Sequence, residues 1–259
     1  MQLTGMHWLV LNITAFMYGF NKTGIVGSAI VCTPMMLLFF TPGTVLGILV
    51  PLLVVADIMT VALLRRDVIW RHICRALPWA ILGIVIGWQI AKATTGLGDA
   101  DQTLLRKIIA GVLIFLLLFG YVVRLRPNLV VPAAGENKGE GTKTWFAAVM
   151  GTMAGITTML ANNGGPAWVV YLSSLGMSVR EFLSTAAWLF FIQNLTKVPF
   201  AVNLGFVTRD TLWINLWLIP ALLLGLAVGN RVSKRISKKV FTNATQILAM
   251  LGALYLLLR

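Results

Sequence analysis

Three ionisable side chains lie inside or beside long apolar stretches of the sequence. Asp57 is the acidic residue placed well within such a stretch, and Lys22 and Lys197 occupy two others. A charge at the centre of a lipid bilayer costs roughly 2.5–3.5 kcal/mol on insertion scales, so such residues are usually paired or mark an ion pathway. Asp57 is therefore either a proton-coupling residue or one half of a structural ion pair with Lys22 or Arg65.

The two lysines each have two interpretations. Lys197 follows Gln193 and Asn194 at helical spacings of four and three residues, so these side chains share one helix face. That face predicts a polar path through the chain. Lys22 is a candidate ligand for a negative substrate. Both lysines are alternatively explained as long side chains that extend to the lipid headgroups.

A run of polar and helix-breaking residues interrupts the apolar stretch 144–176. Its members are Asn162, Asn163, Gly164, Gly165 and Pro166. Proline breaks a continuing helix but suits the first turn of a new one, and asparagine is a common N-cap. We expect a half-helix that starts near Pro166, is capped by the two asparagines, and directs free amides and its positive dipole end at an anion. The alternative is a hairpin tip without a ligand.

The stretch 6–40 contains a similar interruption around residues 19–24. Its candidate binding residues are Asn21, Lys22, Thr23 and Gly24. Non-helical backbone at membrane depth is tolerated where protein or a water-filled cavity covers it. The two interruptions together therefore predict a cavity between them.

The composition identifies the class of protein that holds these residues. Of 259 residues, 58% are hydrophobic and 11% are charged, against about 25% charged in soluble domains. Each of six apolar stretches is near the ~20 residues that cross a bilayer as a helix. They are 42–64, 72–93, 104–124, 178–203, 211–230 and 240–258. We expect an all-α polytopic membrane protein.

The net charge of +13 is concentrated beside these stretches rather than along a binding face. Arginines at 65–75 and basic residues at 231–239 form two clusters, the pattern of cytoplasmic loops rather than of nucleic-acid binding. Both clusters lie on one side of the membrane if 144–176 enters and leaves on the same side. Treating 6–40 in the same way gives six crossings, both termini outside and a cytoplasmic linker.

The two halves of the chain resemble each other. Residues 78–87 and 220–229 both read Pro-x4-Gly-x3-Gly, a spacing that lets helices approach closely. Asp57 aligns with Asn194. The pattern predicts two inverted repeats, 1–126 and 144–259, joined by the linker 127–143. Each repeat is a re-entrant helical hairpin followed by three transmembrane helices.

Enzyme chemistry has little support in the sequence. His7 and His72 are the only histidines, and no nucleotide-binding or hydrolase motif is present. We expect no enzyme activity, no catalytic residue, no cofactor and no metal site. The candidate residues divide into a substrate-binding group and a coupling or gating pair, Asp57 and Gln193.

The order of these motifs resembles the sulfite exporter TauE/SafE family over nearly the whole chain. The likeness rests on residues 19–25, 63–66, 77–80, 161–166, 171–172 and 194–199. Departures are small: residues 27–29 read Gly-Ser-Ala where the family often has a glycine run, and Ser184-Thr185 replaces a frequent Gly-Thr. The resemblance implies transport of a sulfur-containing anion such as sulfite or an organosulfonate.

The resulting expectation is a secondary transporter, an exporter by resemblance, working by alternating access in the bacterial inner membrane as a multi-pass protein. Its expected partners are a small anionic substrate, the lipid bilayer, and a proton or sodium ion as candidate coupling ion. A homo-oligomer is left open and no nucleic acid is expected. The alternatives are a passive anion channel and a non-transporting membrane scaffold.

Overall fold

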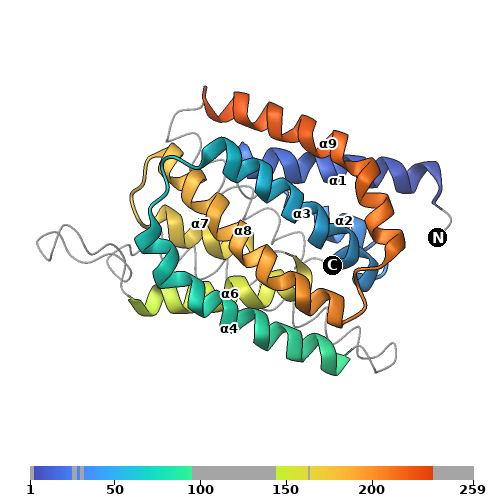
Figure 1. Cartoon of the computed structure of the whole chain (residues 1–259), viewed down its shortest axis with the longest axis horizontal. Coiled ribbons are helices and arrows are strands. Elements are labelled where there is room, and N and C mark those ends of the chain that lie inside the picture. The colour runs from blue at the N-terminus through green and yellow to red at the C-terminus, as the bar shows by residue number, and fades with distance from the viewer. Residues whose placement is uncertain (1–2, 25–27, 30–31, 95–143, 163, 236–259) are drawn as a thin grey trace, which may run out of the picture.

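The computed structural model describes residues 3–24, 28–29, 32–94, 144–162 and 164–235, and all regular structure in these ranges is helical. The first part contains α1 (Gly5–Thr23), α2 (Cys32–Met36), α3 (Pro42–Leu64) and α4 (Trp70–Thr94). The second contains α6 (Thr144–Ala161), α7 (Gly165–Ser173), α8 (Val179–Asn203) and α9 (Arg209–Ser233). Figure 1 shows these helices as elongated rods packed along one another.

Local sequence signals explain where the long helices begin. Thr41 caps α3, its side chain accepting from the Thr44 amide at 3.4 Å, and Pro42 opens the helix. Ser178 and Glu181 form a capping box at the start of α8, with hydrogen bonds of 2.8 and 3.3 Å. Glycines with positive φ precede α8 and α9, Gly176 at 68° and Gly205 at 71°, a conformation that favours glycine.

Three of the described helices are long and apolar enough to cross a membrane: Pro42–Leu64, Trp70–Ala93 and Arg209–Ser233. They correspond to three of the expected spans. The fourth expected span in these ranges, 178–203, forms the 25-residue α8, whose interior polar residues lower its hydropathy. The expected spans 104–124 and 240–258, and the linker, lie outside the described residues.

Both expected hairpins contain a helix break, and the second break lies where it is predicted, between Ala161 and Gly165. The second hairpin is α6 followed by α7, which pack against each other. In the first, α1 continues through Thr23 and ends at Gly24, so the helix stops at the last residue of the interruption predicted around residues 19–24 and not at Gly19. A Cβ on Gly19 would come within 2.1 Å of the Leu222 carbonyl oxygen, so this glycine serves helix packing instead.

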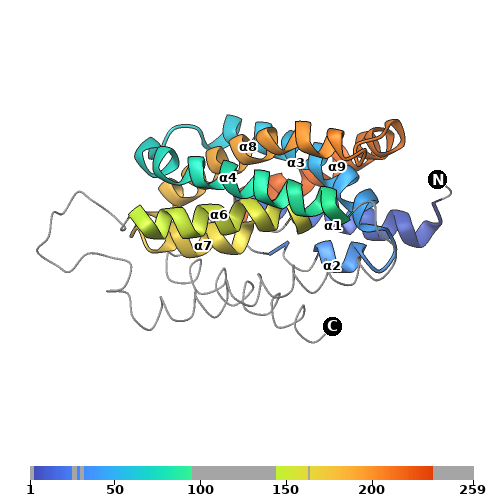
Figure 2. The ribbon, with the colours of Figure 1, turned by 90° about the horizontal axis from the view of Figure 1, so that it is seen from below.

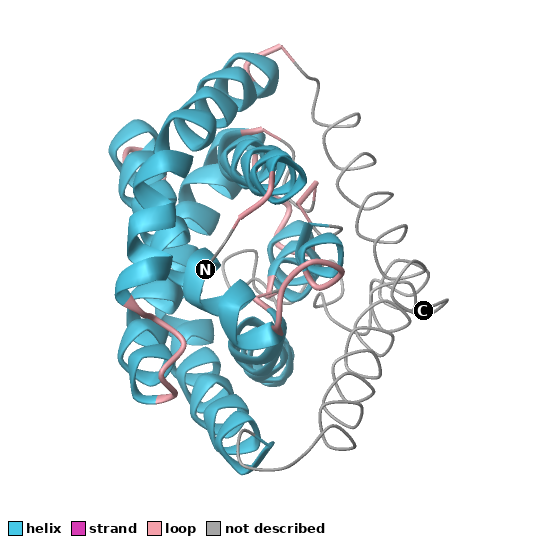
Figure 3. Ribbon diagram, turned by 90° about the vertical axis from the view of Figure 1, so that its right-hand side faces the viewer, coloured by secondary structure: helices cyan, strands magenta, loops and turns pink. Residues whose placement is uncertain are grey.

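Helices from the two halves of the chain pack together in pairs. α1 lies along α9, α4 lies along α6, and α3 lies beside α8 between these two pairs. One core contains side chains of α4, α6, α7 and α8, and the other contains side chains of α1, α2, α3 and α9. In Figure 2, α3, α8 and α9 lie on one side, and α6, α7 and α2 lie on the other. Figure 3 shows the bundle nearly end-on.

The repeated glycine motif, through Gly83 and Gly225, lies at close contacts in the α4–α6 and α1–α9 pairs, as its spacing predicts. A Cβ on Gly155 of α6 would be 2.1 Å from the Ala80 carbonyl oxygen of α4, and one on Gly83 would be 2.2 Å from that of Thr152. On the other pair, a Cβ on Gly225 of α9 would be 2.0 Å from the Phe16 carbonyl oxygen of α1. The predicted close approach is therefore confirmed at both motifs.

Candidate anion site

A buried ion pair joins α1 to α3. Lys22 Nζ lies 2.5 Å from Asp57 Oδ1, and the two side chains are 4% and 0% exposed. Asn194 of α8 donates from Nδ2 to the other carboxylate oxygen, Oδ2, at 2.6 Å. The expected partner of Asp57 is thus Lys22 rather than Arg65. Because Lys22 is buried in this pair, the headgroup interpretation does not describe its position.

Lys197 lies one turn after Asn194 on α8 and is also buried. Its ammonium group donates to Thr158 Oγ1 at 3.3 Å and to the Thr158 carbonyl oxygen at 3.5 Å. It also donates to Asn162 Oδ1. All three acceptors are neutral and belong to the end of α6. Lys197 is therefore directed at the helix break and not at the membrane surface.

Asn162 ends α6 and so determines where the helix break lies. Its φ of 52° is the left-handed conformation that ends α6, one that asparagine tolerates better than most residues. α7 starts after Gly164, its N-cap, which makes no side-chain capping bond. The expected capping by Asn162 is wrong, because Asn162 instead ends α6 and accepts from Lys197. Asn163, the other expected cap, lies outside the described residues. No side chain among the described residues caps the first amides of α7.

Two side-chain amides at this break have unused donors among the described residues. Trp168 Nε1 donates to Gln193 Oε1 at 2.7 Å, which fixes the orientation of the glutamine amide. Gln193 Nε2 and Asn162 Nδ2 are both buried without a hydrogen-bond partner. Buried polar groups in native proteins are nearly always satisfied. Among the described residues, these two donors are therefore available to an acceptor such as a bound anion.

A small cavity of about 40 Å³ lies between these groups. It is lined by Tyr18, Asn21, Lys22, Ala29, Leu53, Thr158, Asn162, Gly164, Gly165, Pro166, Phe190 and Asn194. Seven of the predicted substrate-binding residues are in this set. The last turn of α1 and the α6–α7 break therefore border one cavity, in the region where the sequence predicts one.

Other predicted residues lie beside the cavity or away from it. Lys197 and Asp57 bond to residues at its wall, whereas Gln193 accepts from Trp168, which does not line the cavity. Thr23 and Gly24 do not line it: Thr23 Oγ1 donates to the Leu226 carbonyl oxygen at 2.8 Å, and a Cβ on Gly24 would be 3.0 Å from Gly229 Cα. These two residues hold α1 against α9.

The sequence interpretation did not include five of the lining residues: Tyr18, Ala29, Leu53, Thr158 and Phe190. Thr158 had a signal, because it precedes Asn162 by one helical turn. The aromatic residues had none in so apolar a chain. Phe190 lies under Lys22, whose Nζ is 4.2 Å from the ring centroid, and Tyr18 Oη shares a 2.8 Å hydrogen bond with Thr33 Oγ1.

The charges of this cluster do not balance among the described residues. Lys22, Lys197 and Asp57 are its ionisable lysine and acidic side chains, so the cluster carries one net positive charge when all three are ionised. No group of three metal-ligating side chains occurs within the described ranges. The chemistry available here is thus hydrogen bonding and charge stabilisation of an anion.

Comparison with known proteins agrees with this geometry. The profile of the sulfite exporter TauE/SafE family matches residues 11–256. The chain belongs to the TauE/SafE family. No curated protein and no solved structure matched the chain.

Membership of the TauE/SafE family confirms the resemblance drawn from the motifs. It implies a membrane transporter of a sulfite-like anion, with a lipid bilayer around it. Proteins of this family are transporters rather than enzymes. The site described above is consistent with such a substrate, because sulfite and sulfonate groups present several oxygen acceptors and a negative charge.

Proposed function

We propose that this protein is an alternating-access carrier that exports a small sulfur-containing anion, sulfite or an organosulfonate, across the bacterial inner membrane as a multi-pass protein. The observation that carries the proposal is the unbalanced charge at the α6–α7 break. Two buried lysines and one buried carboxylate surround a cavity that two unpartnered amide donors also approach. A bound anion would balance the charge and accept from these donors.

Each binding residue has a proposed role in this site. Lys22 attracts the anion from the α1 side. Asn162 Nδ2 and the uncapped amides of α7 donate to its oxygens from the other side, where the dipole of α7 adds positive potential. Lys197 and Gln193 hold the break in position and contribute charge and a donor. Asn21 and Asn194 complete the wall.

The arrangement of the helices supports two inverted repeats. Asp57 and Asn194 are each the sixteenth residue of their helix, counting from Pro42 in α3 and Val179 in α8. The two helices are antiparallel at their contact. Asp67 and Arg180 pair at one end at 3.6 Å, and Gly47 contacts Phe206 at the other. A symmetry operation that exchanges the two halves would place α1 on α6 and α9 on α4. It would therefore also interchange the α1–α9 and α4–α6 pairs. Such internal symmetry suits alternating access.

Asp57 is the proposed coupling residue, with a proton as the coupling ion and sodium as the alternative. The carboxylate competes with the substrate for Lys22, because both are anions beside one ammonium group. Neutralising Asp57 frees Lys22 for the substrate. We expect Asp57→Asn to abolish gradient-driven uptake into vesicles while sparing anion exchange. Unchanged gradient-driven uptake in this variant, measured in proteoliposomes, would remove Asp57 from the coupling mechanism.

Counterflow in proteoliposomes tests the transport proposal. Protein reconstituted with unlabelled sulfite inside should accumulate labelled sulfite transiently and with saturation, because a carrier exchanges one substrate molecule for another. Large unitary currents without counterflow would indicate the passive channel instead. A scaffold would give neither signal, and a triple variant at Lys22, Asn162 and Lys197 would then keep all function apart from any effect on folding.

A further inference from the structure

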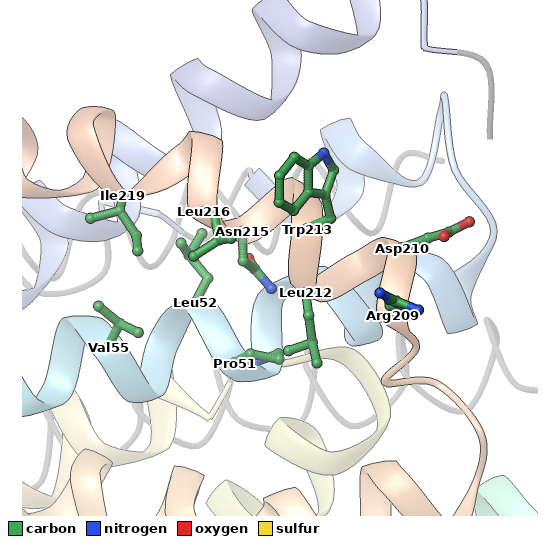
Figure 4. A pocket seen from close by; sticks show the side chains of 10 residues that line it. All are labelled: Pro51, Leu52, Val55, Arg209, Asp210, Leu212, Trp213, Asn215, Leu216 and Ile219. Carbon is green, nitrogen blue, oxygen red and sulfur yellow. The ribbon is translucent and has the colours of Figure 1, made fainter.

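A second cavity, of about 550 Å³, lies between α3 and α9, away from the anion site. Its walls are mostly apolar and include Leu52 and Val55 from α3 and Leu216 and Ile219 from α9 (Figure 4). Both helices are long and apolar enough to cross a membrane. Leu216 is 57% exposed, so the groove opens at the surface that faces lipid in a membrane-spanning protein.

The groove lies next to a close contact between α3 and the segment that leads into α9. A Cβ on Gly47 would lie 2.0 Å from the Phe206 carbonyl oxygen and 3.2 Å from Thr211 Cγ2, so the two segments are in close contact there. One turn further along α3 is Pro51, which lacks an amide hydrogen and lines the groove. Pro51 therefore forms part of the groove wall close to this contact.

A polar side chain interrupts the apolar wall. Asn215 lines the groove and is 6% exposed, yet neither Nδ2 nor Oδ1 has a hydrogen-bond partner among the described residues. Figure 4 shows its side chain on the α3 side of α9, near Leu52 and Pro51. A buried amide without partners indicates a ligand that brings hydrogen-bonding atoms into the groove.

The polarity of the groove changes along its length. Arg209 and Asp210 border one end, Asn215 follows, and Val55 and Ile219 form an apolar opposite end. Arg209 and Ile219 are ten residues apart on one helix, which is about 15 Å at 1.5 Å per residue. That is half of the ~30 Å hydrocarbon core, the depth of one leaflet. The ligand that matches this sequence of surfaces is an amphiphile lying parallel to the helices.

We propose that the α3–α9 groove binds one membrane phospholipid. One acyl chain lies against Leu52, Val55, Leu216 and Ile219, an ester carbonyl oxygen accepts from Asn215 Nδ2, and the phosphate lies beside Arg209. In the topology inferred above, the start of α9 is on the outer side, so the lipid belongs to the outer leaflet. This site is separate from the anion site and does not depend on the transported substrate.

Native mass spectrometry of the full-length, delipidated protein titrated with dioleoylphosphatidylglycerol tests the proposal. Wild type should bind one lipid saturably. Asn215→Leu should weaken this binding by about five- to tenfold, because it removes one hydrogen-bond donor without reducing the volume of the side chain. Leu216→Trp should abolish it by obstructing the groove. The control is Leu224→Trp on the same helix, at a residue 59% exposed and outside the groove, and it should bind like wild type.

Thermal unfolding of each variant without lipid, and its stabilisation by sulfite, checks that the fold and the anion site remain intact. Equal lipid binding by all four proteins would overturn the proposal. So would the absence of a saturable lipid on wild type. A wild-type dimer that Leu216→Trp separates would also overturn it, because a second copy of the chain would then cover the groove.

Discussion

At the scale of single residues, the central feature is that a lysine–aspartate pair and a second lysine are buried together. A buried ion pair contributes little net stability unless further hydrogen bonds satisfy it, and Asn194 supplies one to Asp57. Lys197 has only neutral acceptors from the described residues. Its charge is therefore the one that a substrate anion is expected to balance.

Removing one partner of the Lys22–Asp57 pair should be costly. We expect Lys22→Met to lower the free energy of unfolding by about 3–5 kcal/mol, because it leaves the carboxylate buried without its cation. Asp57→Asn in the same chain should restore much of this loss. Unfolding of detergent-solubilised single and double variants measures the coupling. If the stability losses of the two single variants simply add in the double variant, the two side chains have no coupling energy.

The position of Asp57 also shows how far single residues could be predicted. The sequence identified the charge and named Lys22 as one of two structural partners, because charges in an apolar span must pair. It also aligned Asp57 with Asn194, which proves to be its neighbour. The capping by Asn162 was wrong because a left-handed residue that ends one helix lies too early to cap the next. Tyr18 and Phe190 were missed because aromatic side chains carry no distinguishing signal in an apolar chain.

At the scale of elements, packing depends on glycines that allow backbones to touch. Gly83 and Gly225 occupy equivalent places in the α4–α6 and α1–α9 pairs, and Gly155 and Gly19 are the matching glycines on the partner helices. The Pro-x4-Gly-x3-Gly repeat made these contacts predictable. The end of α1 was less predictable, because Gly19 can break a helix or serve its packing, and tertiary contact with α9 selects the second role.

Gly155→Val and Gly225→Val should each destabilise the protein. The added side chain starts from a Cβ about 2 Å from a carbonyl oxygen, and overpacking of this kind costs about 1–3 kcal/mol or more. We expect a lower thermal unfolding midpoint in detergent for both variants. Gly5→Ala is the matched control, because a Cβ there meets nothing within 4 Å. Similar midpoints for all three variants would contradict the close approach.

At the scale of the whole molecule, we propose two inverted repeats, in which the first helix of each repeat packs against a helix of the other repeat, α1 against α9 and α6 against α4. The composition predicted the helical membrane class, and the basic clusters predicted the side on which each loop lies. A cavity between the two interruptions was predicted, but the side chains that line it required the three-dimensional structure. Sequence spacing places residues on a helix face, but it does not give the register between helices that are distant in the chain.

Cysteine labelling tests the topology. In a background with Cys32→Ala and Cys74→Ser, Asn203→Cys at the end of α8 should react with a membrane-impermeant maleimide in intact cells. Asp67→Cys, between α3 and α4, should react only after the membrane is opened, because the basic cluster beside it is cytoplasmic. The opposite labelling pattern would invert the topology, and labelling of both in intact cells would contradict the single crossing by α8.

The most direct measurement for the anion site is thermal stabilisation of the purified protein by sulfite, a sulfonate, sulfate and acetate, in wild type and Lys197→Met. A ligand at about 100 times its dissociation constant stabilises the fold by roughly 2.7 kcal/mol. We expect sulfite or the sulfonate to stabilise wild type and the control Lys234→Met, whose lysine is exposed. In Lys197→Met the dissociation constant should rise at least tenfold, because a charge-assisted hydrogen bond contributes about 1.5–3 kcal/mol. Equal stabilisation of Lys197→Met, or none of wild type by any sulfur anion, would contradict the account.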